Sequence, residues 1–289
     1  MAYRFLKLAW SLPLHLRLAL VVALTSLLWA YWSTLGEAAE RWVHDPLYAH
    51  GFLVPLFALG LLVARWGEFR PQQVSPSWWG LPVLLGAAGL RLLGAYFHFN
   101  WLDAISFLPC LAGLCLLVGG SQTLRWAWPA VLFLAFMIPL PFQVGEALAD
   151  PLRALATPVC TYVLQTLGLP ALAEGNRILM NDVDLDIVGQ CSGLRMLVTF
   201  FALSTAVALM IRKPLWERLL IVASAIPIAL AANMARITVT GILLETAGDR
   251  ISHHAVHEGA GLAMMPLGLV LLALELKYLK HLLIEPTPA

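Results

Sequence analysis

The chain is a succession of apolar stretches, each about 20 residues long, separated by short segments that carry most of the charge. A helix of that length crosses the hydrocarbon core of a bilayer, and a soluble domain rarely contains many of them. Composition agrees, since 60% of the 289 residues are hydrophobic and only 12% are charged. Soluble domains are roughly half apolar and about a quarter charged. The sequence therefore predicts an all-α polytopic membrane protein.

The apolar stretches predict about eight transmembrane helices, within a range of roughly seven to nine. The second and fourth are short, and the seventh contains Pro227. The N-terminus is basic and then apolar without a clear cleavage site, so we expect an uncleaved first span within one integral membrane domain, 1–289. The expected spans are 16–35, 51–66, 79–97, 103–119, 126–143, 191–211, 215–235 and 259–279.

Basic residues indicate the orientation of these spans. With the N-terminus inside the cell, all four lysines of the chain fall on the inner side, as the positive-inside rule requires. These are Lys7, Lys213, Lys277 and Lys280. Both termini are therefore expected to be cytoplasmic. A formal net charge of +1 and the lack of a basic tract give no indication of nucleic-acid binding.

The longest segment expected outside the membrane is 144–190. Its first part, 144–168, has apolar residues at helical spacing and predicts an amphipathic helix at the membrane surface or packed on the bundle. Further on, Val183, Leu185 and Ile187 alternate with acids, which predicts a small β-hairpin with one wet face. This extracytoplasmic insertion runs directly into Cys191 at the start of the sixth span.

Three side chains suited to acyl transfer are expected at the outer ends of different spans: Cys191, Arg236 and His257. A lone cysteine is usually a small core residue, but the N-terminus of a helix and the nearby Arg195 both favour a thiolate at Cys191. Arg236 either extends its side chain to water near a helix end or stabilises an oxyanion. Histidine beside a cysteine nucleophile is the usual general acid and base.

Some features of the sequence are compatible with other chemistries. His253, His254 and His257 lack a clear set of further ligands, and the cysteines lack zinc-site spacing, so no metal or cofactor is expected. Asp182 and Asp184 in an outer loop suggest a lipid-linked glycosyltransferase, but they alternate with Val and Leu on a predicted strand, so a solvated strand face is the better explanation. A non-enzymatic transporter is a third interpretation. Charges that cluster at one membrane face, instead of lining the midplane, argue against it.

Several motifs of the chain resemble those of the exosortase/archaeosortase family of polytopic cysteine transpeptidases. CSGLR, NMAR and HEGAG occur in the family's order and are expected on one membrane face; they occupy 191–195, 233–236 and 257–261. Further similarity covers DPLYAHGFLVPL, FMIPLP and GLPALAEGNRI, which occupy 45–56, 136–141 and 168–178. A terminal histidine motif, in place of a second arginine, is typical of the bacterial exosortases.

The resemblance implies that Cys191 is the nucleophile and that Arg236 and His257 complete the catalytic set, with Arg195, Asn233 and His254 in support. It implies cleavage of a C-terminal sorting signal, such as Pro-Glu-Pro followed by a membrane helix and a basic tail, through an acyl-enzyme thioester. Exported proteins and membrane lipid would be the partners, and the site would face the periplasm from the bacterial inner membrane. Asp45 and His50 are candidates for substrate contact.

Overall fold

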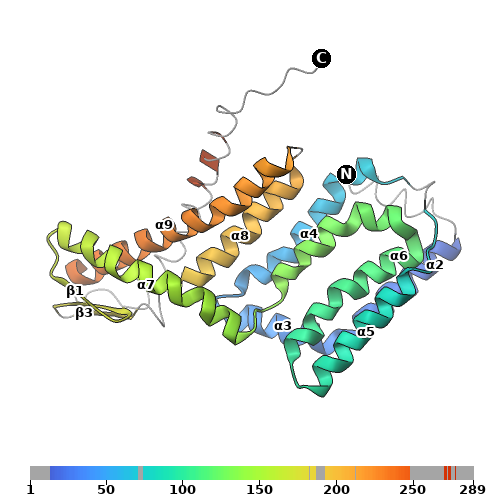
Figure 1. The fold of residues 1–289 in the computed structure, drawn as a ribbon, viewed down its shortest axis with the longest axis horizontal. Coiled ribbons are helices and arrows are strands. Elements are labelled where there is room, and N and C mark those ends of the chain that lie inside the picture. The colour runs from blue at the N-terminus through green and yellow to red at the C-terminus, as the bar shows by residue number, and fades with distance from the viewer. Residues whose placement is uncertain are drawn as a thin grey trace, which may run out of the picture. The chain divides into compact units, whose positions relative to one another are not determined.

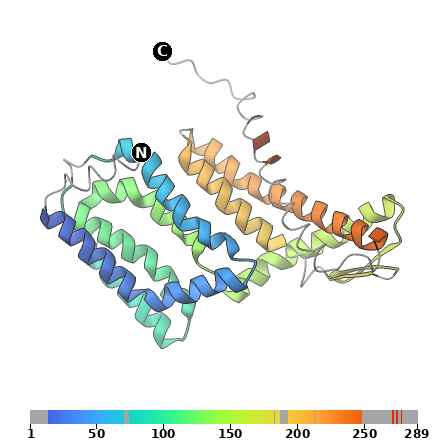
Figure 2. The ribbon, with the colours of Figure 1, turned by 180° about the vertical axis from the view of Figure 1, so that it is seen from behind.

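The computed structural model describes residues 14–70, 74–181, 183–186, 193–211 and 213–247, together with a few positions between 270 and 277. Within these ranges the chain is almost entirely helical apart from one small sheet (Figures 1 and 2). It divides into two compact units, Met1–Pro141 and Phe142–Ala289, which are described separately.

The first unit is a bundle of apolar helices that begins with α2 (Leu14–Ala30) and α3 (Trp32–His44). The predicted first span, 16–35, is therefore broken at Tyr31, where one helix ends and an amphipathic one begins. Four elements follow: the short 3₁₀ turn η1 (Ala49–Phe52), α4 (Leu53–Ala64), the turn η2 (Trp66–Glu68) and α5 (Gly80–Tyr96). The apolar cores of these helices match the second and third predicted spans closely.

The long helix α6 (Asn100–Phe133) contains a break at Gly120, which has a positive φ of 73°. A Cβ atom there would lie 2.0 Å from the carbonyl oxygen of Ser75, so only glycine fits. The ribbon doubles back within α6 in both views (Figures 1 and 2). The two halves correspond to the predicted spans 103–119 and 126–143, but the second gives way to the 3₁₀ turn η4 (Leu134–Met137) before Pro139.

A partly buried polar cluster joins the helices of the first unit. Asp103 forms an ion pair with Arg91, whose Nε lies 3.1 Å from Oδ1, and it accepts a hydrogen bond from Thr34 Oγ1. Ser106 Oγ donates to the Asp103 carbonyl over 2.6 Å, so the Tyr31 hydroxyl donates to Ser106 over 2.8 Å. The Arg91 guanidinium also lies 4.5 Å from the centre of the Tyr31 ring. The polar groups of this cluster therefore hydrogen-bond or pair with one another.

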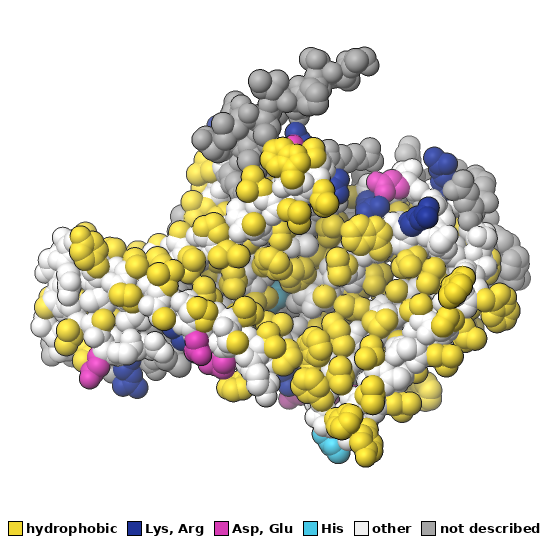
Figure 3. Space-filling model, viewed as in Figure 1, with side chains coloured by type: hydrophobic (Ala, Val, Ile, Leu, Met, Phe, Trp, Pro, Cys, Tyr) yellow, Lys and Arg dark blue, Asp and Glu magenta, His cyan; other side chains and the backbone are white. Residues whose placement is uncertain are grey.

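The second unit begins with α7 (Phe142–Thr166), which confirms the helix predicted at 144–168. The face of α7 turned inward carries mostly small residues such as Gly145, Ala149 and Ala156. Its exposed face is largely apolar and shows as yellow side chains on the surface (Figure 3). Phe142, Leu148, Leu155, Val159 and Tyr162 lie on it. An exposed apolar face of this kind suits a helix in contact with lipid.

A three-stranded antiparallel sheet follows, formed in order by β1 (Ala171–Glu174), β2 (Arg177–Met180) and β3 (Val183–Asp186). The strand predicted from alternation is β3, but the sheet is larger than the expected hairpin and starts earlier. The turn between β1 and β2 contains Gly175 at a φ of 59°, the conformation that a tight two-residue hairpin turn requires. Ile178 and Met180 of β2 are buried against α7 and α9.

Two long helices complete the described part of the second unit: α8 (Gly193–Met210) and α9 (Leu215–Ala247). They pack through small residues of α9, Ala225, Ala229 and Ala232, against Met196 and Phe200 of α8. The seventh span was expected to end near residue 235, whereas α9 continues to Ala247. The predicted eighth span, 259–279, lies almost wholly outside the described residues.

Within the described residues, three stretches are long and apolar enough to cross a membrane: Asn100–Met137, Gly193–Met210 and Leu215–Thr246. Shorter apolar helices cover Val21–Ala30, Ala49–Ala64 and Gly80–Tyr96. The first long stretch contains the break at Gly120 and thus two of the predicted spans. A polytopic helical membrane protein is confirmed, while the count of about eight spans and the cytoplasmic termini stay predictions.

Candidate active site

The first residue of α8, Gly193, lies directly against α9. A Cβ atom at this position would be 3.1 Å from Asn233 Nδ2 and 3.6 Å from Leu152 Cβ of α7. Such separations leave little room for a side chain, so glycine allows the start of α8 to approach both neighbouring helices. The contact joins two of the motifs identified in the sequence, because Gly193 belongs to CSGLR and Asn233 to NMAR.

Arg236 lies one turn beyond Asn233 on the inward side of α9. It is the largest fully buried side chain of the described structure, with 1% of its surface exposed. A guanidinium is costly to bury unless its N–H groups are hydrogen-bonded or paired with an anion. Since α9 also continues for three turns beyond this residue, Arg236 does not extend to water from a helix end. A role inside the protein is the better interpretation.

Thr240 extends this buried polar stripe by another turn, and the sequence analysis missed it. Both Asn233 and Thr240 are at least nine-tenths buried. Asn233 Oδ1 and Thr240 Oγ1 have no hydrogen-bond partner within the part of the chain that the structure describes. The spacing of Asn233, Arg236 and Thr240 (i, i+3, i+7) would have placed all of them on one helix face. Asn233, at one end of this stripe, lies beside the start of α8.

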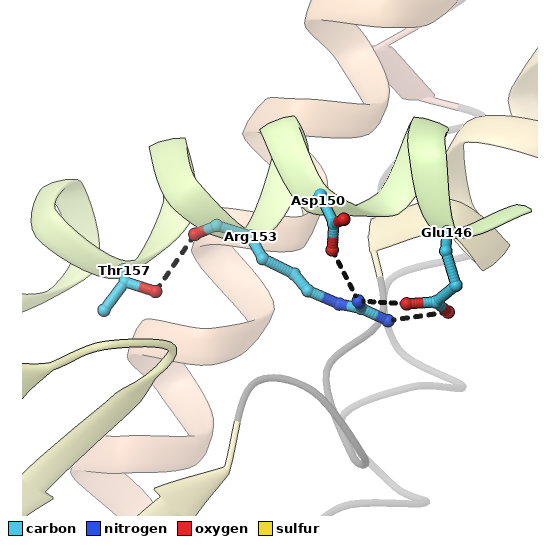
Figure 4. Close-up of polar contacts among 4 residues, drawn as sticks. All are labelled: Glu146, Asp150, Arg153 and Thr157. Carbon is cyan, nitrogen blue, oxygen red and sulfur yellow. Dashed lines mark hydrogen bonds and ion pairs between the residues drawn. The ribbon is translucent and has the colours of Figure 1, made fainter. Parts of the chain in front are cut away.

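Helix α7 also comes close to the start of α8, through Leu152, and Arg153 is the next residue along α7. Arg153 is buried yet forms ion pairs with two acids of its own helix (Figure 4). Its Nη1 lies 2.8 Å from Glu146 Oε2 and 3.1 Å from Asp150 Oδ1. The hydrogen bond from Arg153 lowers the pKa of Glu146, and the same bond raises the pKa of Arg153. This cluster holds a cation on the inward face of α7 and compensates its charge.

An apolar cluster fixes α7, the sheet and α9 to one another. Cys160 of α7 is fully buried, and its thiol donates a hydrogen bond to the Met234 carbonyl oxygen over 3.6 Å. Leu164, Ile178 and Ile237 pack in the same cluster. The stripe on α9 is therefore held on a rigid scaffold, and Cys160 has a structural role within it.

Only some of the other predicted site residues of the second unit belong to the described part of the chain. Arg195 lies in the first turn of α8 and is half-buried. Asp184 lies in β3, where its Cα pairs with that of Leu179. Cys191, His254, His257 and Asp182 lie outside the described residues. Among the residues that are described, no three His, Cys, Asp or Glu side chains gather closely enough to hold a metal ion.

Asp45 and His50, the candidates for substrate contact, belong to the first unit and have local partners. Asp45 Oδ1 accepts a hydrogen bond from the Leu47 backbone over 2.9 Å and so stabilises the turn after α3. His50 Nε2 lies 3.2 Å from the Phe136 carbonyl oxygen. These contacts give both residues a packing role, and substrate contact stays a prediction.

Trp42 joins the same two segments of the first unit. Its indole N–H donates to the Met137 carbonyl oxygen over 3.0 Å. A Cβ atom at position 51 would lie only 2.3 Å from that indole nitrogen, so Gly51 is required for the contact. The DPLYAHG and FMIPLP segments, noted separately in the sequence, are therefore packed against each other.

Comparison with known proteins identifies the family. No curated protein and no solved structure matches the chain. The family model described as transmembrane exosortase (Exosortase_EpsH) matches residues 42–274, which include every motif singled out above. The match extends over most of both units. The chain therefore belongs to the transmembrane exosortase family.

Proposed function

We propose that this exosortase is a cysteine transpeptidase or peptidase that cleaves the C-terminal sorting signal of exported proteins. Family membership supports a membrane-embedded enzyme that processes sorting signals. The cysteine mechanism, the substrate motif and a site on the periplasmic side of the bacterial inner membrane are parts of the proposal. The observation that carries it is the contact of Gly193 with Asn233. Gly193 lies two positions after Cys191, and Asn233 lies three positions before Arg236.

In the proposed reaction the Cys191 thiolate attacks the scissile carbonyl carbon, forming a C–S bond. Arg236 stabilises the oxyanion that develops on the carbonyl oxygen. When the C–N bond breaks, His257 gives its proton to the departing amine. The resulting thioester is then attacked by an acceptor amine or by water, which loses a proton to histidine, and the Cys191 thiolate is released.

The sequence around Cys191 supports a reactive thiol. Cys191 itself lies outside the described residues, but it precedes Gly193, the first residue of α8, by two positions in the sequence. The first N–H groups of a helix lack intrahelical partners, and the helix dipole is positive at that end. Arg195 lies in the first turn of the same helix. Both features favour a thiolate. The other cysteines contrast with it, since Cys110 and Cys115 belong to the apolar helix α6 and Cys160 is a core residue.

The test is replacement of Cys191 by alanine and by serine in a host that expresses a tagged substrate. We expect complete loss of processing in both variants, with Cys110→Ala as a control that keeps wild-type activity. Processing by Cys191→Ala would exclude the mechanism. A thiol reagent that cannot cross the membrane should label Cys191 and inactivate the enzyme, which would also support an outward-facing site.

The same assay separates the alternatives. A lipid-linked glycosyltransferase would be abolished by Asp182→Asn or Asp184→Asn and would tolerate Cys191→Ala. A transporter would show no covalent product in any variant. For the histidine, loss of processing in His254→Ala but not in His257→Ala would transfer the catalytic assignment to His254.

A further inference from the structure

The three-stranded sheet is held rigidly on α7 and α9. Ile178 of β2 is fully buried in the apolar cluster between these helices. Asn181 Nδ2, in the turn after β2, donates to Glu245 Oε1 of α9 over 2.9 Å. At the same end of the sheet, where Ala171 pairs with Met180, Gln165 Nε2 of α7 donates to the Ala171 carbonyl oxygen over 2.8 Å. The sheet is therefore a preorganised platform beside the helix that carries Asn233 and Arg236.

The register shows which backbone groups point away from the sheet. The pairs Glu174–Arg177 and Met180–Val183 each flank a two-residue turn and so exchange hydrogen bonds. Hydrogen-bonded and non-bonded pairs alternate along antiparallel strands. The backbone N–H and C=O groups of Ala171 and Ala173 therefore point outward from β1, and those of Asp184 and Asp186 point outward from β3. The bond from Gln165 to the Ala171 carbonyl agrees with this assignment.

The two edges of the sheet differ. The β1 edge is occupied at Ala171 by a side chain of α7, whereas β3 pairs only with β2 within the described residues. β3 also contacts α9. Its last residue, Asp186, precedes Cys191 by five positions, which an extended chain spans in about 17 Å at most. Among the described residues, the edge without a strand partner therefore belongs to the strand that precedes the proposed nucleophile in the sequence.

We infer that the outer edge of β3 binds the extended segment of the protein substrate that precedes the substrate's own membrane helix, and that this segment adds as a fourth strand. The inference rests on the proposed function. A peptide that enters a site near the membrane boundary must leave water, and its backbone N–H and C=O groups then need partners. Strand addition to a free edge supplies them through main-chain bonds that do not depend on the substrate sequence.

The register provides a matched pair of variants to test this. Asp184→Pro removes an N–H that points outward, and an edge strand tolerates proline at such a position. Asp184→Ala keeps the N–H and removes only the carboxylate. We expect Asp184→Pro to lower the rate of processing by about tenfold or more, as for a hydrogen bond left unmade. Asp184→Ala should stay within about twofold of wild type, since it keeps that bond.

The folding of Asp184→Pro is checked by its thermal unfolding temperature and by alkylation of Cys191, both of which should match those of Asp184→Ala. If folded Asp184→Pro processes substrate as well as Asp184→Ala does, the inference is wrong while the proposed function stands. If Asp184→Ala is as inactive as Asp184→Pro, the side chain is what matters and strand addition is excluded. Processing by Cys191→Ala would instead remove the proposed function itself.

A second measurement does not depend on the proline variant. In a Cys191→Ala background, Asp184→Cys is combined with single cysteines placed in turn along the substrate segment before its membrane helix. A bound strand predicts disulfide cross-links at alternate substrate positions, because successive side chains point to opposite faces of a strand. Cross-links at every position, at none, or at every third or fourth position would contradict strand addition.

Discussion

Each of the two units contains a cluster of polar residues among its helices, partly buried in the first unit and buried in the second. The two clusters differ in how their hydrogen-bonding groups are satisfied. In the first unit, Arg91 pairs with Asp103, and the hydroxyl of Tyr31 donates to Ser106. In the second, Asn233 Oδ1 and Thr240 Oγ1 are buried without a hydrogen-bond partner within the described residues, on the helix face that carries Arg236. In the first unit the polar side chains bond to one another, whereas in the second two buried oxygen atoms have no partner among the described residues.

The difference indicates different roles. A closed cluster of hydrogen bonds and ion pairs inside an apolar bundle stabilises the contacts among α2, α3, α5 and α6. Buried polar atoms that lack protein partners lower stability, and such costs are commonly found where a substrate supplies the missing partner. Substitutions in the first unit should therefore change stability, and substitutions in the stripe on α9 should change catalysis.

The largest effect is expected for Arg236→Lys. Lysine keeps the positive charge but loses the planar set of N–H groups that can hold an oxyanion, so processing should fall by about 100-fold or more. The measurement is the initial rate of cleavage of a tagged substrate in membranes. Arg218→Lys, near the start of the same helix, is the matched control and should stay near wild type. If Arg236→Lys processed substrate at the wild-type rate, the proposed catalytic role of the stripe on α9, in contrast to the structural role of the first unit's cluster, would be wrong.

The next effect concerns the closed cluster. Asp103→Leu leaves Arg91 without its carboxylate partner, and we expect the free energy of unfolding in detergent to fall by about 2 kcal/mol, less than for a fully buried pair. Processing per folded molecule should be unchanged. The double variant Arg91→Leu/Asp103→Leu should lose less than the sum of the single losses, because no unpaired charge remains. A slower turnover of folded Asp103→Leu would show that this cluster also serves catalysis.

The two polar groups also show what the sequence predicts and what it does not. The helices α7 and α8 follow from hydropathy and periodicity, and within the described residues both lie close to the expected ranges, 144–168 and 191–211. The predicted end of the seventh span was wrong for α9, because hydropathy treats a charged residue such as Arg236 as the limit of a span. A buried arginine is compatible with a continuing helix only when tertiary contacts surround it, and these cannot be read from one helix alone.

The sheet and the ion pairs illustrate the same limit. Gly175-Asn176 is a turn signal that would have predicted the β1–β2 hairpin, yet strands of four residues give weak alternation. The pairing of Arg91 with Asp103, and the contact of Gly193 with Asn233, join positions that are distant in the sequence. Three motifs in the family's order predict which residues form the site, whereas the contact of Gly193 with Asn233 required the structure.

A smaller effect is expected where α8 meets α9. Gly193→Ala places a methyl group 3.1 Å from Asn233 Nδ2, so Asn233 or the start of α8 must move. Overpacking of this kind costs roughly 1–3 kcal/mol, and we expect processing to fall about tenfold. Gly145→Ala is the control, because its Cβ would meet Leu194 Cδ2 at an ordinary 3.7 Å. Equal activity of the two variants would argue against the contact as a determinant of site geometry.

The smallest effect concerns pH and the ion cluster of α7. Arg153 holds the pKa of Glu146 below its ordinary value in the folded state, so unfolding raises that pKa and, in acid, takes up a proton. The stabilisation is therefore complete above the unfolded pKa of about 4.3 and is lost as the pH falls through the folded pKa. Because Glu146 is largely exposed, we expect only about 0.5 kcal/mol at neutral pH. The free energies of unfolding of wild type and Glu146→Gln, measured by thermal unfolding, should differ by this amount at pH 7 and converge in acid. If the difference between them did not change with pH, the pair with Arg153 would contribute nothing to stability.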